Sequence, residues 1–300
     1  MTEAIRHRLN NSPFARWTVL IIVATAMMMG YFVNDVMSPL ETLLELPKSQ
    51  GGLGWTPSDY GFFSGAGSFI NVFLLMLFFS GLILDKMGIR FTGVLACSLM
   101  ALGTLLKLYG VTTDFGTAEI AIFGFQLPMS VAVASLGFAV FGVGYEMTGI
   151  TVSKAMVRWF TGHELALAMG IQLAMARLGT AAALSISAPI ARHFALSTPL
   201  LVSLAFLIIG LLAFLVFCVM DRKLDSSIAS MSSSPSSGRA IRATDDSEDV
   251  SRSDSEEFHW GDILVTLRNP GFWLITLFCV LFYSAVSPFL KFSTKLMVMK

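Results

Sequence analysis

Seven long apolar stretches dominate this sequence and limit what it can fold into. Each approaches the length of roughly 20 residues that a helix needs to cross the hydrocarbon core of a bilayer. They cover residues 17–40, 59–84, 91–109, 127–160, 164–190, 199–220 and 271–290. Charged residues make up 13% of the chain, about half the share found in a soluble domain. The sequence therefore predicts an all-α membrane protein that contacts the lipid bilayer.

Basic residues are concentrated in alternate connections between these predicted spans. They lie at the N-terminus, between spans two and three, at the end of span four and after span six, as Arg6, Arg8, Arg16, Lys86, Arg90, Lys154, Arg158, Arg222 and Lys223. Short loops that are rich in Lys and Arg stay in the cytosol, so we expect the N-terminus to be cytosolic. The net charge is zero, which gives no reason to expect a nucleic-acid partner.

The composition changes after the sixth span, where serine and acidic residues replace apolar ones. Such a segment cannot bury enough apolar surface to order itself. We therefore divide the chain into a cytosolic N-terminus (1–16), a six-helix transmembrane domain (17–220), a disordered cytosolic linker (221–257) and a surface helix followed by a seventh span (258–300). Many secondary transporters consist of two repeated halves with the substrate site between them. The sequence stops soon after span seven, so we expect either a truncated product or a chain that needs an accessory membrane subunit.

The connection between spans two and three carries a recognisable pattern. It contains two glycines, one acid and two basic residues, namely Gly81, Asp85, Lys86, Gly88 and Arg90. Gly81 permits close helix packing, Gly88 permits the positive φ of a tight turn, and Asp85 can accept from a helix N-terminus or an arginine. The alternative is an ordinary positively charged turn. The spacing resembles the signature loop of the major facilitator superfamily, although Ile89 stands where that family usually has a basic residue. The resemblance implies a conformational latch on the cytosolic face.

Glu146 and Arg177 are the strong charges that lie deep inside spans four and five. Glu146 precedes Phe160 by fourteen residues and Arg177 follows Glu164 by thirteen, which correspond to about 21 Å and about 20 Å of helix. The two charges are therefore expected at similar depth near the bilayer midplane, where a charge must face a cavity or a partner. One hypothesis is a substrate site, because arginine suits the capture of a carboxylate. The other is an ion pair that holds the two helices together.

Two further polar residues are candidates for substrate binding. Asp35 is expected near the outer mouth of span one, about 27 Å of helix from Trp17. There it either binds an ammonium group or a proton, or is simply solvated. Gln172 lies about one and a half turns before Arg177 and lines the cavity or bonds to a neighbour. Lys107 is expected to extend its amine to the outer interface, and Lys291 to mark the outer end of span seven.

The segment from Gly144 to Gly179 resembles one branch of the major facilitator superfamily, the branch that contains lysosomal dipeptide transporters and their bacterial relatives. The similar stretches are Trp159-Phe160-x-Gly162-x-Glu164-Leu165 and Gly170-x-Gln172-Leu173-x-Met175-Ala176-Arg177-x-Gly179. The resemblance implies the six-helix half of the major facilitator fold plus one further helix. It also implies a passive uniporter for dipeptides that works by alternating access, in a lysosomal membrane if eukaryotic or an inner membrane if bacterial.

By the same resemblance, Arg177 meets the substrate carboxylate, and Glu146 meets its amino end or stabilises Arg177. Tyr145 stands where the family suggests a second glycine, which puts the shape of the pocket in question.

Three other functions are weighed against the dipeptide carrier. The first is a superfamily carrier for another organic anion, a sugar or a drug, with Glu146 or Asp35 as the proton-coupling acid. The second is a seven-span receptor, which the loop pattern and the long linker disfavour. The third is an enzyme, but the spans contain no metal-ligand constellation or nucleophile triad, so we expect neither catalysis nor a cofactor.

Overall fold

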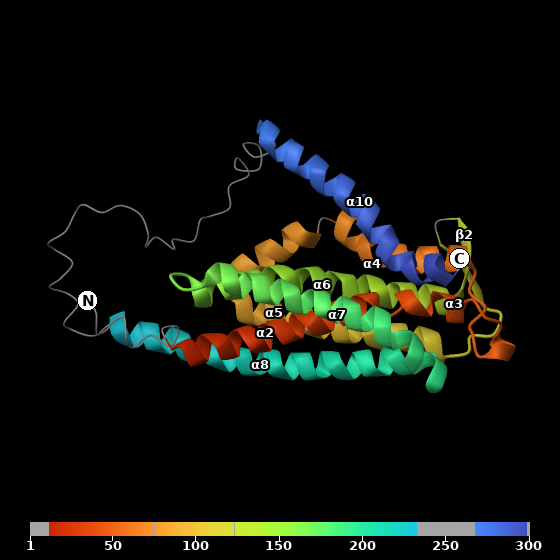
Figure 1. Ribbon diagram of the computed structural model, residues 1–300, viewed down its shortest axis with the longest axis horizontal. Coiled ribbons are helices and arrows are strands. Elements are labelled where there is room, and N and C mark those ends of the chain that lie inside the picture. The colour runs from red at the N-terminus through yellow and green to blue at the C-terminus, as the bar shows by residue number, and fades with distance from the viewer. Residues whose placement is uncertain (1–11, 75, 123, 233–267, 299–300) are drawn as a thin grey trace.

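The protein is a bundle of long helices from which one helix diverges (Figure 1). The computed structural model describes residues 12–74, 76–122, 124–232 and 268–298. In chain order, the elements are α2 (Pro13–Asp35), η2 (Ser38–Leu40), α3 (Glu41–Leu44), η3 (Lys48–Gln50), α4 (Pro57–Phe73), α5 (Met76–Thr112), β1 (Glu119–Ile122), β2 (Phe125–Pro128), α6 (Met129–Phe160), α7 (Leu165–His193), α8 (Thr198–Ser232) and α10 (Pro270–Val298). Six helices within the described residues are long and apolar enough to cross a membrane. This confirms the predicted all-α membrane fold.

The second predicted span is divided between two helices. α4 begins with a capping box between Thr56 and Asp59 and has 17 residues, which is short for a bilayer. α5 contains a non-helical residue, Gly88, with φ 80° and ψ 169°. The second crossing therefore combines α4 with the part of α5 before Gly88, and the rest of α5 is the third span. Gly88 adopts the positive φ that the signature-loop pattern predicted.

Helices α5 and α6 approach each other through glycines. A Cβ added to Gly103 would lie 2.3 Å from the backbone nitrogen of Phe141, and one added to Gly137 would lie 2.5 Å from that of Lys107. Side chains larger than hydrogen cannot fit at these positions without moving a backbone. Helix association in lipid depends on such close packing, because there is no hydrophobic effect between helices in an apolar solvent.

The small residues of spans four and five do not bring those two helices together. An added Cβ at Gly142 would meet Gly67 of α4, one at Gly144 would meet Ala96 of α5, and one at Gly179 would meet the Met28 carbonyl of α2. α6 therefore packs chiefly on α4 and α5, whereas α7 packs chiefly on α2. The short turn between α6 and α7 keeps them antiparallel without making them close partners.

The boundary predicted for the cytosolic linker is wrong by about three helical turns, because α8 continues to Ser232. Asp221 is fully buried and Leu224 is 1% exposed, so contacts with the bundle stabilise this helical extension. The remainder of the predicted linker, 233–257, and the predicted surface helix lie outside the described residues.

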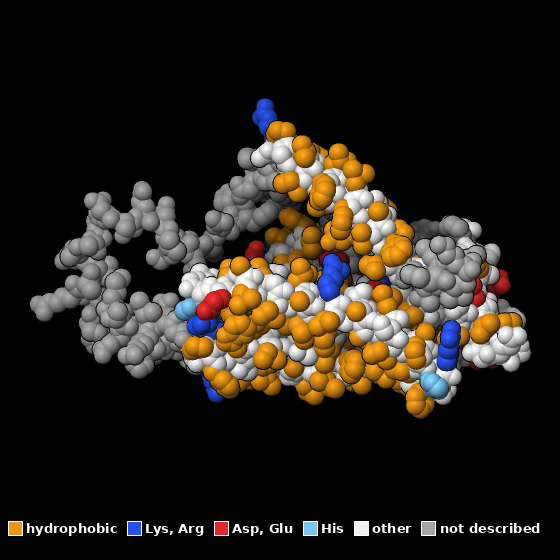
Figure 2. Space-filling model, in the orientation of Figure 1, with side chains coloured by type: hydrophobic (Ala, Val, Ile, Leu, Met, Phe, Trp, Pro, Cys, Tyr) orange, Lys and Arg blue, Asp and Glu red, His pale blue; other side chains and the backbone are white. Residues whose placement is uncertain are grey.

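The surface of the bundle is strongly apolar, as expected for contact with lipid. Figure 2 shows hydrophobic side chains spread along the helices, and exposed examples include Phe69, Leu102, Leu178 and Leu212. α10 is the most exposed helix, and it meets the bundle at η2 and α3 near its C-terminal end (Figure 1). Its N-terminal part diverges from the other helices.

A short β-hairpin at one end of the bundle was not predicted. β1 and β2 pair antiparallel, with Glu119 opposite Pro128 and Ile122 opposite Phe125. The hairpin lies at the same end of the bundle as α3 (Figure 1). Its strands are four residues each, which is too short for a clear alternating pattern to be recognised in the sequence.

Candidate functional site

Two neighbouring cavities lie between α10 and the helices of the bundle. The first, here called the arginine cavity, has a volume of about 420 Å³ and is lined by Asn34, Asp35, Arg177, Thr180 and Lys291 together with three tyrosines. The second, the glutamate cavity, has a volume of about 380 Å³ and is lined by Asn34, Asn71, Glu146, Lys291 and several serines and glycines. Both volumes fall in the range typical of small-molecule sites.

Two tyrosines stand between the predicted acid and the predicted arginine. The rings of Tyr31 and Tyr145 meet edge to face with centroids 5.1 Å apart. The guanidinium carbon of Arg177 lies 5.8 Å from the centre of the Tyr31 ring, within the range of a cation–π interaction. Tyr145 borders both cavities, so the bulky residue that departs from the family pattern forms part of the wall between them.

Glu146 and Arg177 are therefore close to a common wall but face different cavities. Among the described residues, no ion pair joins them, so the alternative of a structural pair between α6 and α7 is not found in this conformation. The physical reason is that α7 packs on α2 instead of on α6. Both side chains remain accessible to a ligand, and their role in binding remains a prediction.

Asp35 is not simply solvated at the mouth of the first span, because it is 6% exposed. Its carboxylate accepts hydrogen bonds from Thr180 Oγ1 at 2.9 Å and from Asn34 Nδ2 at 2.9 Å. Lys291 Nζ of α10 lies 3.0 Å from Asp35 Oδ1 and also donates to the Asn34 carbonyl at 2.9 Å. Sequence reasoning placed Lys291 at the end of a span. The signal in the sequence was that Lys291 interrupts an apolar stretch three residues after Pro288. A lysine in such a stretch needs a polar partner.

Lys107 does not extend to the interface, contrary to expectation. Its side chain is fully buried, and Nζ donates to the Val33 carbonyl at 3.3 Å. The amine also lies 4.4 Å from the centre of the Phe141 ring and 4.8 Å from that of Phe138. Lys107 therefore binds the C-terminal end of α2, where helix carbonyls favour a cation.

Gln172 lies away from both cavities. It is 7% exposed and its amide donates to the Met27 sulfur at 3.2 Å, while its Oε1 is buried with no hydrogen-bond partner. In this conformation Gln172 joins α7 to α2, which corresponds to the alternative of a bond to a neighbour.

Two of the predicted latch residues, Asp85 and Arg90, contact other helices. Asp85 pairs with Lys154 of α6 at 2.5 Å, and Lys86 is exposed. Ile89 is buried, which explains why an apolar residue suits that position here. An added Cβ at Gly81 would meet nothing within 4 Å, so the expected close helix contact at Gly81 is absent from the described residues. The latch function itself remains a prediction.

Arg90 belongs to a group that we call the charge cluster, formed by Arg90, Arg158, Asp221 and Asp225. Arg90 lies 3.8 Å from Asp221 and 2.9 Å from Asp225. Arg158 lies 3.5 Å from Asp221 and also pairs with Asp225. The indole of Trp159 donates to Asp221 at 3.2 Å. This cluster joins the third span, α6 and α8, and sequence reasoning missed both of its acids because they lay in the presumed linker.

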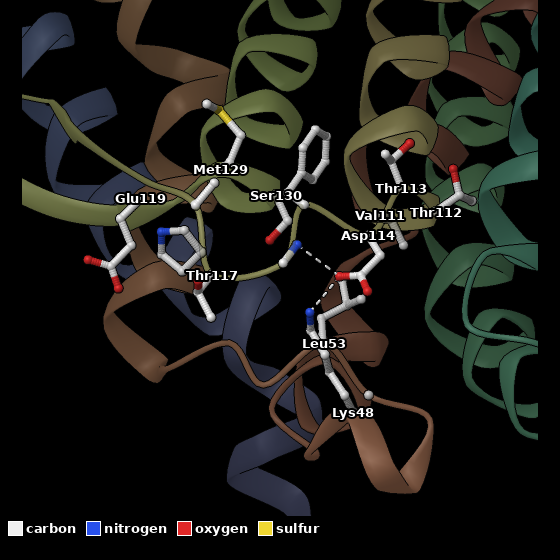
Figure 3. A pocket seen from close by; sticks show the side chains of 15 residues that line it. Lys48, Leu53, Val111, Thr112, Thr113, Asp114, Thr117, Glu119, Met129 and Ser130 are labelled. Carbon is white, nitrogen blue, oxygen red and sulfur yellow. Dashed lines mark hydrogen bonds and ion pairs between the residues drawn. The ribbon is translucent and has the colours of Figure 1, made fainter.

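A third cavity, of about 320 Å³, lies at the hairpin end of the molecule (Figure 3). The Lys48 amine approaches Asp114 Oδ1 at 2.7 Å, and the same oxygen accepts from the Gly116 amide at 3.1 Å. These bonds lower the pKa of Asp114, with the Lys48 hydrogen bond as the main cause. The pair joins two loops outside the spans, so this cavity is remote from the predicted pair of midplane charges.

No family model matches the chain. It is similar to proteins named lysosomal dipeptide transporter MFSD1: 24% identical over 229 residues to those of Bos taurus and Homo sapiens, and 25% identical over 228 residues to that of Danio rerio. Each match covers 72% of this chain, but 41 to 42% of the relative. The chain thus spans about two fifths of the length of these curated relatives. Their names describe transporters and not enzymes. Together with the membrane-spanning helices, these matches confirm that the chain resembles the MFSD1 group of major facilitator transporters.

Proposed function

We propose that this chain forms part of the pathway of a secondary transporter that moves small zwitterions, most simply dipeptides, by alternating access. The observation that carries the proposal is the placement of Glu146 and Arg177 in two neighbouring cavities that share Tyr145 as a wall. A charge within the hydrocarbon region is costly and marks a substrate or ion pathway. An acid and an arginine that do not neutralise each other are available for the two ends of a zwitterion.

A dipeptide carries the two charged groups that this arrangement would bind. Two residues in extended form span at most about 7 Å, which is the largest distance between its ammonium and its carboxylate. In the proposed pose, the guanidinium of Arg177 binds the carboxylate through two parallel hydrogen bonds, and Glu146 receives the amino group. The name of the MFSD1 relatives supports the dipeptide as substrate, and the two charged side chains support any ligand that carries both an ammonium and a carboxylate.

The position of α10 indicates which side of the pathway is closed. α10 contacts the bundle near its C-terminal end, beside Asp35, and its N-terminal part diverges toward the end of the bundle opposite α3 and β2 (Figure 1). With the basic loops in the cytosol, this arrangement is closed outside and open inside. The proposed carrier is a uniporter within a multi-pass membrane protein, lysosomal if the source is eukaryotic.

The first experiment compares Arg177→Ala with Arg177→Lys in purified protein. Saturation with a dipeptide at 100 times its Kd adds about 2.7 kcal/mol to the stability of the protein that binds it. We expect alanyl-alanine to raise the Tm of the wild type, to raise that of Arg177→Lys less, and to leave Arg177→Ala unchanged. The unliganded Tm of all three should agree, because Arg177 is exposed. An equal ligand response in Arg177→Ala would refute the proposal.

A second experiment separates uniport from proton coupling. The native protein is placed in liposomes, and dipeptide uptake is measured with and without an imposed pH gradient. Uptake that stops at equal concentrations on both sides under either condition supports uniport. Accumulation driven by the gradient would favour the proton-coupled alternative, with Glu146 as the titrating acid.

A further inference from the structure

Lys291 is the residue through which α10 contacts the polar end of α2. Its amine bonds to the Asp35 carboxylate at 3.0 Å and to the Asn34 carbonyl at 2.9 Å. The same amine lies 5.4 Å from the centre of the Phe138 ring of α6. A neighbouring ring contact between Tyr60 and Phe292, at 5.8 Å, also joins α10 to the bundle. One lysine thus links α10 to both α2 and α6.

Lys291 is also accessible to a ligand in either cavity. It borders the arginine cavity and the glutamate cavity, and its side chain is 21% exposed, against 8% for Asp35. In the arginine cavity it shares the lining with Arg177. A carboxylate bound there therefore has two cations within the same enclosure, of which one is already engaged by a protein carboxylate.

The bonds around Asp35 and Lys291 allow an exchange of partners. Without Lys291, Asp35 still accepts from Thr180 and Asn34, so its buried charge keeps two hydrogen bonds. Lys291 likewise keeps the Asn34 carbonyl and the Phe138 face. Breaking a buried ion pair is costly when it leaves a charge with no partner at all. When a substrate carboxylate replaces Asp35, Lys291 stays paired with an anion, and Asp35 keeps its hydrogen bonds from Thr180 and Asn34.

We infer that Lys291 is a second cationic contact for the substrate carboxylate, and that binding transfers its amine from Asp35 to that carboxylate. The inference rests on the proposed function and adds to it a specificity-determining residue on α10. Asp35 then acts as a competitor of the substrate and not as a ligand for its amino group. Because the Asp35–Lys291 bond is a main attachment of α10 to α2, the exchange also loosens the closed outer end of the pathway.

The test is a double-mutant cycle with two probes. Kd values for alanyl-alanine and for alanyl-alanine amide, which lacks the carboxylate, are measured on the full chain in nanodiscs. The variants are Asp35→Asn, Lys291→Gln and the combination of both, with Lys48→Gln as a control that removes a lysine remote from both cavities. A charge-assisted hydrogen bond contributes on the order of a tenfold change in affinity.

The exchange predicts opposite effects of the two single substitutions. Asp35→Asn frees Lys291, so affinity for alanyl-alanine should rise about threefold to tenfold, while affinity for the amide stays unchanged. Lys291→Gln should lower affinity for alanyl-alanine by about tenfold. In the combined variant, the gain from Asp35→Asn should vanish because no amine is available to bind the ligand.

Each other result overturns the inference in an identifiable way. If Asp35→Asn weakens both probes, Asp35 binds the amino group. If it strengthens both equally, the ion pair controls access and Lys291 does not contact the carboxylate. If both singles bind like the wild type while Arg177→Ala loses binding, the proposed function stands and the inference fails. If the wild type binds neither probe, the proposed function fails, and the inference fails with it.

Discussion

Tyr31 of α2 and Tyr145 of α6 meet edge to face with their ring centroids 5.1 Å apart. This contact forms part of the wall between the cavities that hold Glu146 and Arg177. It also places the Tyr31 ring beneath the guanidinium of Arg177. Two aromatic residues therefore keep an acid and a base apart at the depth where an ion pair was one of the expectations.

Removal of the Tyr145 ring should merge the two cavities. Tyr145 also stacks on Phe141 with centroids 5.9 Å apart, so Tyr145→Ala withdraws support from Tyr31 and from Arg177 above it. We expect affinity for alanyl-alanine to fall about tenfold, equivalent to about 1.4 kcal/mol, as measured by titration in nanodiscs. Tyr145→Phe, which keeps the ring, is the control and should bind within about twofold of the wild type. Equal losses in both variants would show that the hydroxyl, and not the wall, matters.

Neutralising Asp221 should destabilise the charge cluster. Asp221 has no exposed side-chain surface and contacts two arginines and an indole. Asp221→Asn should lower the free energy of unfolding by about 2 kcal/mol. This loss is smaller than for a buried ion pair that has no second acid, because Asp225 still contacts both arginines. The matched control is Asp85→Asn, because the Asp85 side chain is 71% exposed and that of its partner Lys154 is 44% exposed. This substitution should change the free energy of unfolding by less than about 1 kcal/mol. Thermal unfolding in detergent measures both, and a larger effect at Asp85 would contradict the assignment.

The crossing of α5 and α6 should be intolerant of a single methyl group. A Cβ at Gly137 would lie 2.5 to 2.9 Å from backbone atoms of Lys107, Gly103 and Leu106. Gly137→Ala should therefore destabilise the protein by about 3 kcal/mol through overpacking. Gly149 lies in the same helix with open space around it, so Gly149→Ala should be neutral or stabilising by up to about 1 kcal/mol. If both variants unfold at the same temperature, the two helices do not cross as closely as described.

The Lys48–Asp114 contact should loosen in acid. Its hydrogen bonds lower the pKa of Asp114 below the ordinary 3.8, so the contact contributes its full stability above that value and loses it as the pH falls through the lower folded pKa. The Gly116 amide, which donates to Asp114, should lose protection from hydrogen exchange over this interval. Asp114→Asn serves as the control and should show no change in relative protection over the same interval. A Gly116 amide whose protection does not change with pH in the wild type would contradict the assignment.

Several features of the fold follow from local sequence. Long apolar runs predicted membrane-spanning helices, because the backbone in lipid must satisfy its hydrogen bonds within each helix. The turn at Gly88 was predictable because its positive φ suits glycine and depends on few other residues. The boundary of α8 was not predictable, since Asp221 is held by arginines of α6 and of the third span and Leu224 is buried in the bundle.

The sequence by itself showed which charges interrupt the long apolar helices, because such interruptions are visible without any knowledge of packing. It identified Asp35, Glu146 and Arg177 in this way. The tertiary structure alone decided their partners. Asp35 pairs with a lysine 256 positions further along the chain, and Glu146 and Arg177 face separate cavities because α7 packs on α2. Spacing along a helix fixes depth and face, but the choice of neighbouring helix depends on how all the glycine contacts and side-chain shapes fit together at once.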